Sequence, residues 1–206
     1  MHGEDAKYMM EAYNTNRMST VGKNLDEIEK QIAEFAGVNY AAGTAVLHLA
    51  AKPAGEKIYG QAQPYEGTCC LRKILCSDLT FEASINPVAY EDGEAVFVDT
   101  KYDTWNMNPA ALEKSLELYP KVKIVVPAHL YGTPGKIEEL KEICDRHGAL
   151  IVEDAAENPG AKYLYHSKWK ETGRFGTFNC ISFNGNNVFE TEMRKFDCKE
   201  STKMVA

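Results

Sequence analysis

The chain has 206 residues and carries 23 basic against 30 acidic residues, which gives a net charge of -7. This charge argues against proteins that grip nucleic acid or an anionic membrane, because both need a basic surface. The hydrophobic fraction of 44% is ordinary for a globular protein, and the length suffices for one α/β domain or two small domains. No run approaches the roughly 20 apolar residues of a membrane-spanning helix. The N-terminal stretch also lacks the apolar core of a signal peptide, so we expect a cytoplasmic protein.

The six cysteines include an adjacent pair, Cys69 and Cys70, and no two are spaced as a CxxC motif. That arrangement is unfavourable for a zinc site and for a simple disulfide framework. The sequence therefore predicts reduced, mostly buried thiols and no metal site.

Two features are predicted in the first part of the chain. Residues 24–37 (NLDEIEKQIAEFAG) are predicted to form a helix, because Asn24 is a good N-cap, acidic residues follow it, and Gly37 ends the pattern. Residues 60–68 (GQAQPYEGT) are predicted to form a loop.

From residue 95 onward, short apolar runs alternate with amphipathic segments. The predicted strands are 95–100, 123–130, 149–155 and 178–184, and the predicted helices are 108–119 and 133–148. Strands that are apolar nearly throughout and separated by helices indicate a parallel sheet covered on both faces. We therefore expect a three-layer α/β/α fold between about residues 74 and 183, with Asp154 at the carboxyl end of a strand.

Polar residues follow several of these predicted strands: Asp99, His129, Asp154, Glu157, Ser182 and Asn184. Ligands of open parallel sheets bind beyond the carboxyl ends of the strands, so these residues are candidates for a site. Each has a simpler interpretation as well. An aspartate at a strand end is often a helix cap, and His129 is equally compatible with a structural role.

Several segments, in order, resemble the DegT/DnrJ/EryC1/StrS aminotransferase family. They are RMSTVGKN (17–24), AGTAVLHLA (42–50), FVDTKYDTWNMNP (97–109), HLYGTPGKIEELKEICDRHG (129–148), HGALIVEDAAENPGAKY (147–163) and TGRFGTFNCISFNGN (172–186). The resemblance implies a large domain of fold-type I enzymes that use pyridoxal phosphate (PLP). It also implies transfer of an amino group, usually from glutamate, to a keto-sugar nucleotide, in dimers that share active-site residues. A homo-oligomer or self-associating chain is therefore expected.

The resemblance assigns roles to individual residues. Asp154 matches the acid beside the pyridine nitrogen, where a carboxylate stabilises a protonated ring. Phe81 matches the aromatic residue that stacks on the ring, and Glu157 lies where the family has a residue near the phenolic oxygen. The phosphate is expected to be held by Gly43, Thr44, Ala45 and Ser182.

The chain departs from the family pattern at Asn187, which occupies the position of the Schiff-base lysine. A carboxamide nitrogen can neither form an imine nor shuttle a proton, so any PLP is expected to be bound noncovalently. Histidine, which replaces the lysine in family members that are sugar dehydratases, is also absent there. Lys195 lies beyond the required spacing.

Further departures concern the length of the chain. The segment before Gly43 is short by several residues, and the second half of the family's length, including its C-terminal domain, has no counterpart. Residues 1–187 are thus predicted to be a partial large domain, with 1–37 as an N-terminal helical segment and 188–206 as an unmatched charged tail. These departures favour a truncated or frameshifted family member that is catalytically defective. The alternatives are a noncatalytic module that binds PLP or a nucleotide-sugar, and an interaction partner of a full-length homologue.

Overall fold

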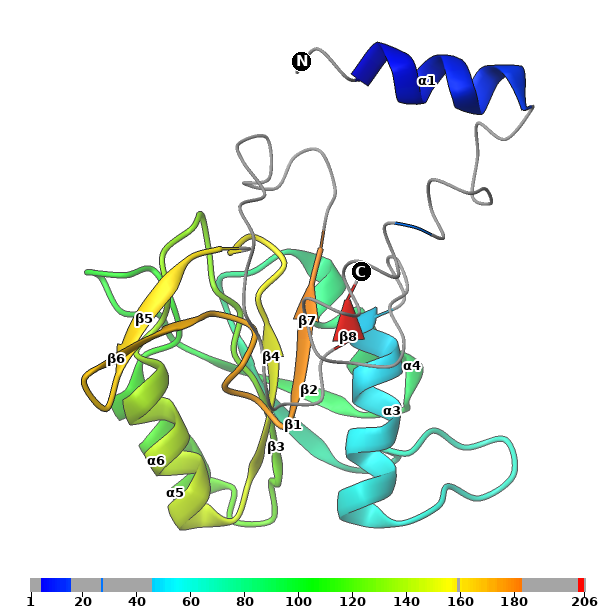
Figure 1. Ribbon diagram of the computed structural model, residues 1–206. Helices are drawn as coiled ribbons and strands as arrows, with labels where there is room; N and C mark the ends of the chain where they lie inside the picture. Colours follow the sequence, from blue (N-terminus) through cyan, green and yellow to red (C-terminus); the bar gives the residue numbers. More distant parts are fainter. Residues whose placement is uncertain (1–4, 16–26, 28–45, 159, 183–203, 206) are drawn as a thin grey trace.

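The computed structural model describes residues 5–15, 27, 46–158, 160–182 and 204–205. Its centre is a six-stranded sheet in the order β2-β1-β3-β4-β7-β8, in which every neighbouring pair is parallel (Figure 1). The strands are β1 (Lys73–Ser77), β2 (Glu94–Val98), β3 (Ile124–Val126), β4 (Leu150–Asp154), β7 (Phe178–Ile181) and β8 (Met204–Val205). The predicted parallel sheet is confirmed.

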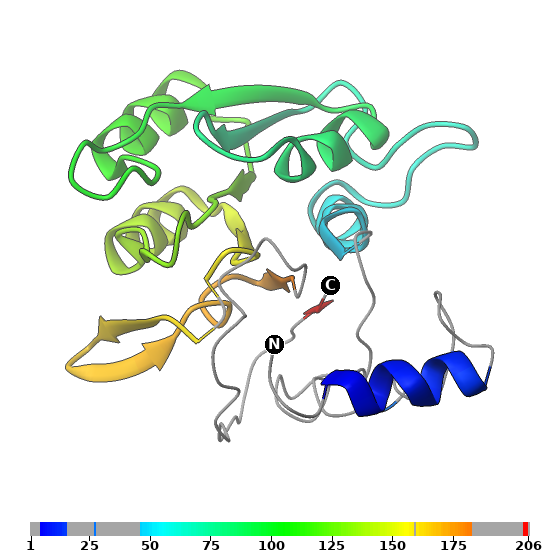
Figure 2. The same ribbon diagram turned by 90° about the horizontal axis from the view of Figure 1, so that it is seen from above.

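Helices cover both faces of this sheet, because alternate strand residues point to opposite sides. Ile74, Val126 and Val152 belong to a cluster with residues of α3 (Val46–Tyr59) and α4 (Asn86–Tyr90). Leu75, Val125 and Ile151 pack on the other face with residues of α5 (Pro109–Leu118) and α6 (Ile137–His147). Figure 2 shows α3 on one side of the strands and α5 and α6 on the other. The predicted three-layer α/β/α arrangement is thus confirmed.

The helices α5 and α6 end where the sequence indicates, but α6 begins later than predicted. The Asn108 side chain accepts a hydrogen bond from the Ala110 N–H at 3.0 Å and caps α5, as predicted. Gly148 ends α6 in the left-handed conformation with φ 62°. The prediction that this helix starts at residue 133 was wrong by four residues, because residues 133–135 still bind the segment that follows β3. The Gly135 N–H donates to the His129 side chain, and helix α6 starts only at Ile137.

Several elements had not been predicted. They are α1 (Asp5–Asn14), the helices α3 and α4, the strand β1, the 3-10 turn η1 (Glu82–Ser84), and an antiparallel hairpin of β5 (Lys162–Tyr165) and β6 (Lys168–Glu171). Strand β8 pairs with β7, so a segment for which no strand had been predicted extends the sheet. The helix predicted at residues 24–37 lies almost entirely outside the described residues.

The described cysteines agree with the expectation of reduced thiols. Cys69, Cys76 and Cys144 are buried thiols outside any disulfide, Cys70 is a partly buried one, and Cys180 is buried in β7. Burial raises the pKa of the Cys76 and Cys144 thiols to about 12. These buried thiols behave as small apolar side chains of the core. Within the described residues, no helix is long and apolar enough to span a membrane.

Candidate functional site

Asp154, the last residue of β4, lies at the carboxyl edge of the sheet. Its N–H donates to the Pro127 carbonyl at 3.0 Å, and its carbonyl accepts from the His129 N–H at 2.9 Å. The next residue, Ala155, donates its N–H to the Cys180 carbonyl of β7 at 2.8 Å. Backbone hydrogen bonds to both neighbouring strands or their extensions therefore fix the position of Asp154, as expected for a residue that must present a side chain accurately.

The Asp154 carboxylate is buried, with 5% of the residue exposed. Ser84 Oγ donates to Oδ2 at 2.5 Å, and the Ala156 N–H donates to Oδ1 at 3.0 Å. No ion pair joins Asp154 to a described basic residue. Burial raises the pKa of Asp154, although the hydrogen bonds from Ser84 and Ala156 act in the opposite direction. The carboxylate is thus held in place without a neutralising cation, an arrangement that favours binding of a positively charged group.

Ser84 and its neighbours come from the short segment that follows β1. Ser84 is buried in the turn η1, and its hydroxyl lies 2.7 Å from that of Thr80. Phe81 precedes the turn and is 66% exposed. The structure thus shows Phe81 as an accessible aromatic ring three residues away from a buried hydroxyl that contacts Asp154.

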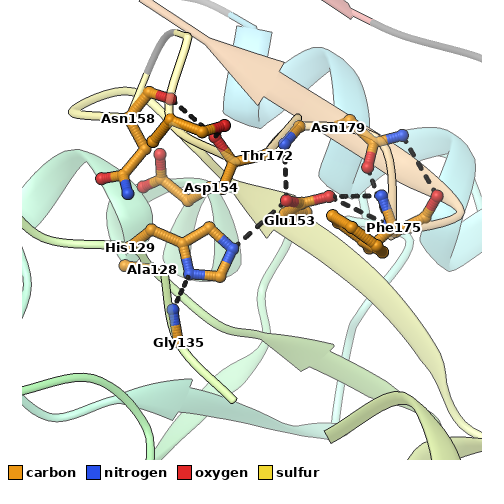
Figure 3. Close-up of polar contacts among 12 residues, drawn as sticks. Ala128, His129, Gly135, Glu153, Asp154, Asn158, Thr172, Phe175 and Asn179 are labelled. Carbon is orange, nitrogen blue, oxygen red and sulfur yellow. Dashed lines mark hydrogen bonds and ion pairs between the residues drawn. The ribbon is translucent and has the colours of Figure 1, made fainter. Parts of the chain in front are cut away.

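Glu153 precedes Asp154 and is 1% exposed. Its Oε1 accepts from His129 Nε2 at 3.2 Å and from the Gly173 N–H at 2.6 Å. Its Oε2 accepts from the N–H groups of Phe175 at 2.7 Å and Gly176 at 3.0 Å (Figure 3). Burial by itself would raise the pKa of Glu153, but the hydrogen bonds from His129, Phe175 and Gly173 outweigh it and lower the pKa. The Glu153 carboxylate therefore connects the turn before β7 to the segment that follows β3.

His129 belongs to this Glu153 network. The Gly135 N–H donates to His129 Nδ1 at 3.2 Å, so the ring proton is on Nε2 and points to Glu153 (Figure 3). Both ring nitrogens are thereby occupied, and the residue is buried. Of the two interpretations left open for His129, this geometry supports the structural one.

Two residues of the turn after β4 also contribute polar groups. Glu157 Oε2 accepts from the Tyr131 N–H at 2.9 Å. Asn158 is fully buried, and neither its amide nitrogen nor its amide oxygen has a hydrogen-bond partner. Its backbone carbonyl accepts from Thr172 Oγ1 at 2.6 Å. Buried amides are rarely left unpaired, so a water molecule or a ligand atom is the expected partner of the Asn158 side chain.

The remaining predicted site residues are placed as follows. Ser182 comes directly after β7, at the same edge of the sheet as Asp154, and is partly buried. Asp99 follows β2 and accepts the Thr100 N–H at 2.8 Å, which is the ordinary role of a turn residue. Gly43, Thr44, Ala45, Asn184 and Asn187 lie outside the described residues.

Ser84, Thr80 and Glu153 are site residues that sequence reasoning missed. The only available signal for the first two was the spacing of hydroxyls around Phe81 in TFEAS (80–84). Glu153 reads in the sequence as the polar end of an apolar strand. Among the described residues, no three His, Cys, Asp or Glu side chains are grouped so that they could hold a metal ion.

The chain matches the DegT/DnrJ/EryC1/StrS aminotransferase family over residues 1–192. It belongs to that family. It is 38% identical over 199 residues to EpsN of Bacillus subtilis (strain 168), named as a pyridoxal phosphate-dependent aminotransferase. That match covers 93% of this chain and 47% of EpsN. The GDP-perosamine synthase of Caulobacter vibrioides is 33% identical over 195 residues, covering 93% of this chain and 48% of the synthase.

Solved structures that are similar to this chain show the same fold. DesV of S. venezuelae, in complex with a ketimine intermediate, has a TM-score of 0.60 at 25% identity; the match covers 81% of this chain and 42% of DesV. A doubly substituted variant of ColD has a TM-score of 0.69 at 19% identity, covering 91% of this chain and 47% of ColD. The chain therefore spans about half the length of the relatives it matches. The family is PLP-dependent, and GDP-4-keto-6-deoxy-D-mannose-3-dehydratase of E. coli has been solved with hydrated PLP bound.

Proposed function

We propose that this chain binds PLP noncovalently at the carboxyl edge of its sheet and, by itself, does not catalyse transamination. The proposal is carried by one observation: Asp154 is a buried carboxylate that lacks a described basic partner. A carboxylate in such a position is stabilised when a cation, such as a protonated pyridine nitrogen, pairs with it. Family membership identifies PLP as the compound that would supply this cation.

Each residue of the site has a separate task in this proposal. Asp154 would hold the proton on the ring nitrogen, Phe81 would cover one face of the ring, and Glu157 would lie near the phenolic oxygen. The phosphate is assigned to Ser182 together with Gly43, Thr44 and Ala45. When bound, PLP supplies an electron sink for bonds at an amino-bearing carbon.

Asn187 is the reason why we propose binding without transamination. The carboxamide supplies neither a covalent anchor for the cofactor nor a base that can move a proton. In longer, lysine-containing members of the family, the corresponding reaction would use a nucleotide-linked sugar and an amino-acid donor. Self-association and a cytoplasmic location remain part of the proposal; light scattering across a concentration series tests the former.

The test is a titration of the purified chain with PLP, followed by absorbance and by quenching of protein fluorescence. We expect saturable binding that Asp154→Ala abolishes. Borohydride treatment followed by peptide mass spectrometry should show no pyridoxyl adduct at residues 182–189. Glutamate-dependent amination of a keto-sugar nucleotide by the wild-type chain would overturn the proposal, and so would an adduct on Lys195. Asn187→Lys alone should not restore transamination, because a catalytic lysine must be held accurately by its surroundings.

A further inference from the structure

We propose that Thr80 and Ser84 form a hydroxyl relay that keeps Asp154 ionised and oriented toward a cationic ligand. Ser84 is then a positioning residue, since it acts on the ligand only through Asp154. The part of this inference that concerns PLP rests on the proposed function. The part that concerns the carboxylate stands on the hydrogen bonds among Thr80, Ser84 and Asp154.

The direction of the relay follows from counting protons. The Ser84 hydroxyl has a single proton, and it donates this proton to Asp154 Oδ2 at 2.5 Å. The proton in the 2.7 Å contact between Thr80 and Ser84 must therefore belong to Thr80. Both hydroxyls point their protons toward Asp154, and a short O–H···O contact to a carboxylate is the strong, charge-assisted kind. If Asp154 were protonated at Oδ2, both donors would have to turn around.

The other groups around Asp154 do not replace this relay. The His129 ring proton is directed at Glu153, and Glu157 adds a negative charge near Asp154. The Cys180 thiol is buried, and its pKa is raised well above the ordinary value, so it stays neutral and adds no charge beside Asp154. Ala156 contributes one N–H at 3.0 Å to the opposite oxygen. Ser84 is thus the side-chain donor on which the ionised form of Asp154 depends.

The backbone of residues 80–84 explains how one segment serves two purposes. The Ser84 N–H donates to the Phe81 carbonyl at 3.0 Å, which closes the turn η1. The turn directs the Ser84 hydroxyl inward to Asp154 while Phe81 stays 66% exposed. The position of Phe81 and the state of Asp154 are therefore set by the same five residues.

The decisive experiment measures the free energy of unfolding of the ligand-free chain between pH 8 and pH 4 for wild type and Ser84→Ala. Loss of a donor to the ionised form raises the pKa of Asp154 further. A carboxyl group whose pKa is raised by folding destabilises the fold above that pKa and ceases to do so as the pH falls. The decrease in the free energy of unfolding caused by Ser84→Ala should therefore be largest at pH 8 and should shrink steadily toward pH 4.

Ser115→Ala is the matched control. Ser115 Oγ likewise donates one hydrogen bond, at 2.8 Å, but to the neutral Ala111 carbonyl on α5. Its cost should not change with pH. Thr80→Val should show the same pH trend as Ser84→Ala, with a smaller loss of the free energy of unfolding. Ser84→Thr keeps the hydroxyl and should show the pH dependence of the wild-type chain. If Ser84→Ala fails to fold, Thr80→Val and Ser84→Thr still decide the question.

The second measurement is the dissociation constant for PLP at pH 7.5. We expect Ser84→Ala to weaken binding about tenfold or more, the loss of one hydrogen bond to a charged group, and Ser115→Ala to leave it unchanged. A pH-independent cost for Ser84→Ala would overturn the relay and leave Ser84 a packing residue. If the wild-type chain binds no PLP, the proposed function fails, whereas a pH-dependent cost would still support the relay.

Discussion

Glu153 and Asp154 are consecutive buried carboxylates on one strand, yet their surroundings are opposite. Glu153 accepts hydrogen bonds from His129, Gly173, Phe175 and Gly176, and its pKa is lowered. Among the described residues, the Asp154 carboxylate accepts hydrogen bonds from Ser84 and Ala156 alone, and its pKa is raised. Because neighbouring residues of a strand point to opposite sides, the two side chains belong to separate environments despite their proximity in sequence.

The difference shows that burial alone does not decide the state of a carboxylate. Both groups lose contact with water, but the number of donors decides whether the charged form is stabilised. Glu153 is saturated by the protein and stabilises the fold. Asp154 is left with fewer donors than a buried charge requires, so it has capacity for a ligand. Three substitutions test this comparison.

The largest expected effect is that of Glu153→Gln. In wild type, each oxygen of Glu153 accepts N–H groups. In the variant, one of these oxygens is replaced by an NH2 group, which cannot accept a hydrogen bond, so at least one buried N–H donor loses its acceptor. We expect the free energy of unfolding at pH 7 to fall by about 3 kcal/mol or more, as when a buried charged pair is broken. Urea denaturation monitored by circular dichroism measures it.

Glu113→Gln is the control for this prediction, because Glu113 pairs with Arg146 and His147 near the surface and should cost far less. The folded-state pKa of Glu153 is lowered, so its contribution is complete above the unfolded pKa of about 4.3 and is lost on acidification. Equal losses for the two variants would contradict the role assigned to Glu153.

Asp154→Asn is expected to change the free energy of unfolding much less than Glu153→Gln does, or to increase it. The amide oxygen can accept the Ala156 N–H, and the amide nitrogen can donate to a reoriented Ser84 hydroxyl. The free energy of unfolding at pH 8 should change by less than about 1 kcal/mol or increase, because a buried charge with a raised pKa is removed. Any gain should shrink toward pH 4. PLP binding should be lost in the same variant, and a stability loss comparable to that of Glu153→Gln would refute the comparison.

The smallest effect on stability is expected for Phe81→Ala. Since the side chain is mostly exposed, the free energy of unfolding should fall by less than about 1 kcal/mol, whereas affinity for PLP should fall severalfold through loss of ring stacking. Tyr102→Ala serves as the control, because Tyr102 is exposed and follows β2 rather than β1. Unchanged PLP affinity in Phe81→Ala would remove Phe81 from the proposed site.

Sequence patterns predicted the strands and helices from residue 95 to residue 183 and the strand end at Asp154, because these depend on local periodicity; β1, β8, α3 and α4 were not predicted. Apolar runs such as ALIVEDA (149–155) and cap residues such as Asn108 and Gly148 act within a few positions of themselves. The hairpin of β5 and β6 was missed because its residues, KYLYHSKWKE (162–171), mix apolar and charged side chains without a clear turn signal. The early start assigned to α6 failed for another reason: the Gly135 N–H is used by His129, six residues earlier.

The family, the layer order and the residue types at the strand ends, including Asn187 in place of lysine, all follow from the amino-acid order alone. The separate roles of the two acids in ED (153–154) emerge only when the chain is folded. Ser84 reaches Asp154 across 70 positions of the chain, and the donors to Glu153 come from segments on both sides of β4. A pKa is set by desolvation and by donors brought together through folding, so no local pattern could have separated the saturated carboxylate from the one with capacity for a ligand.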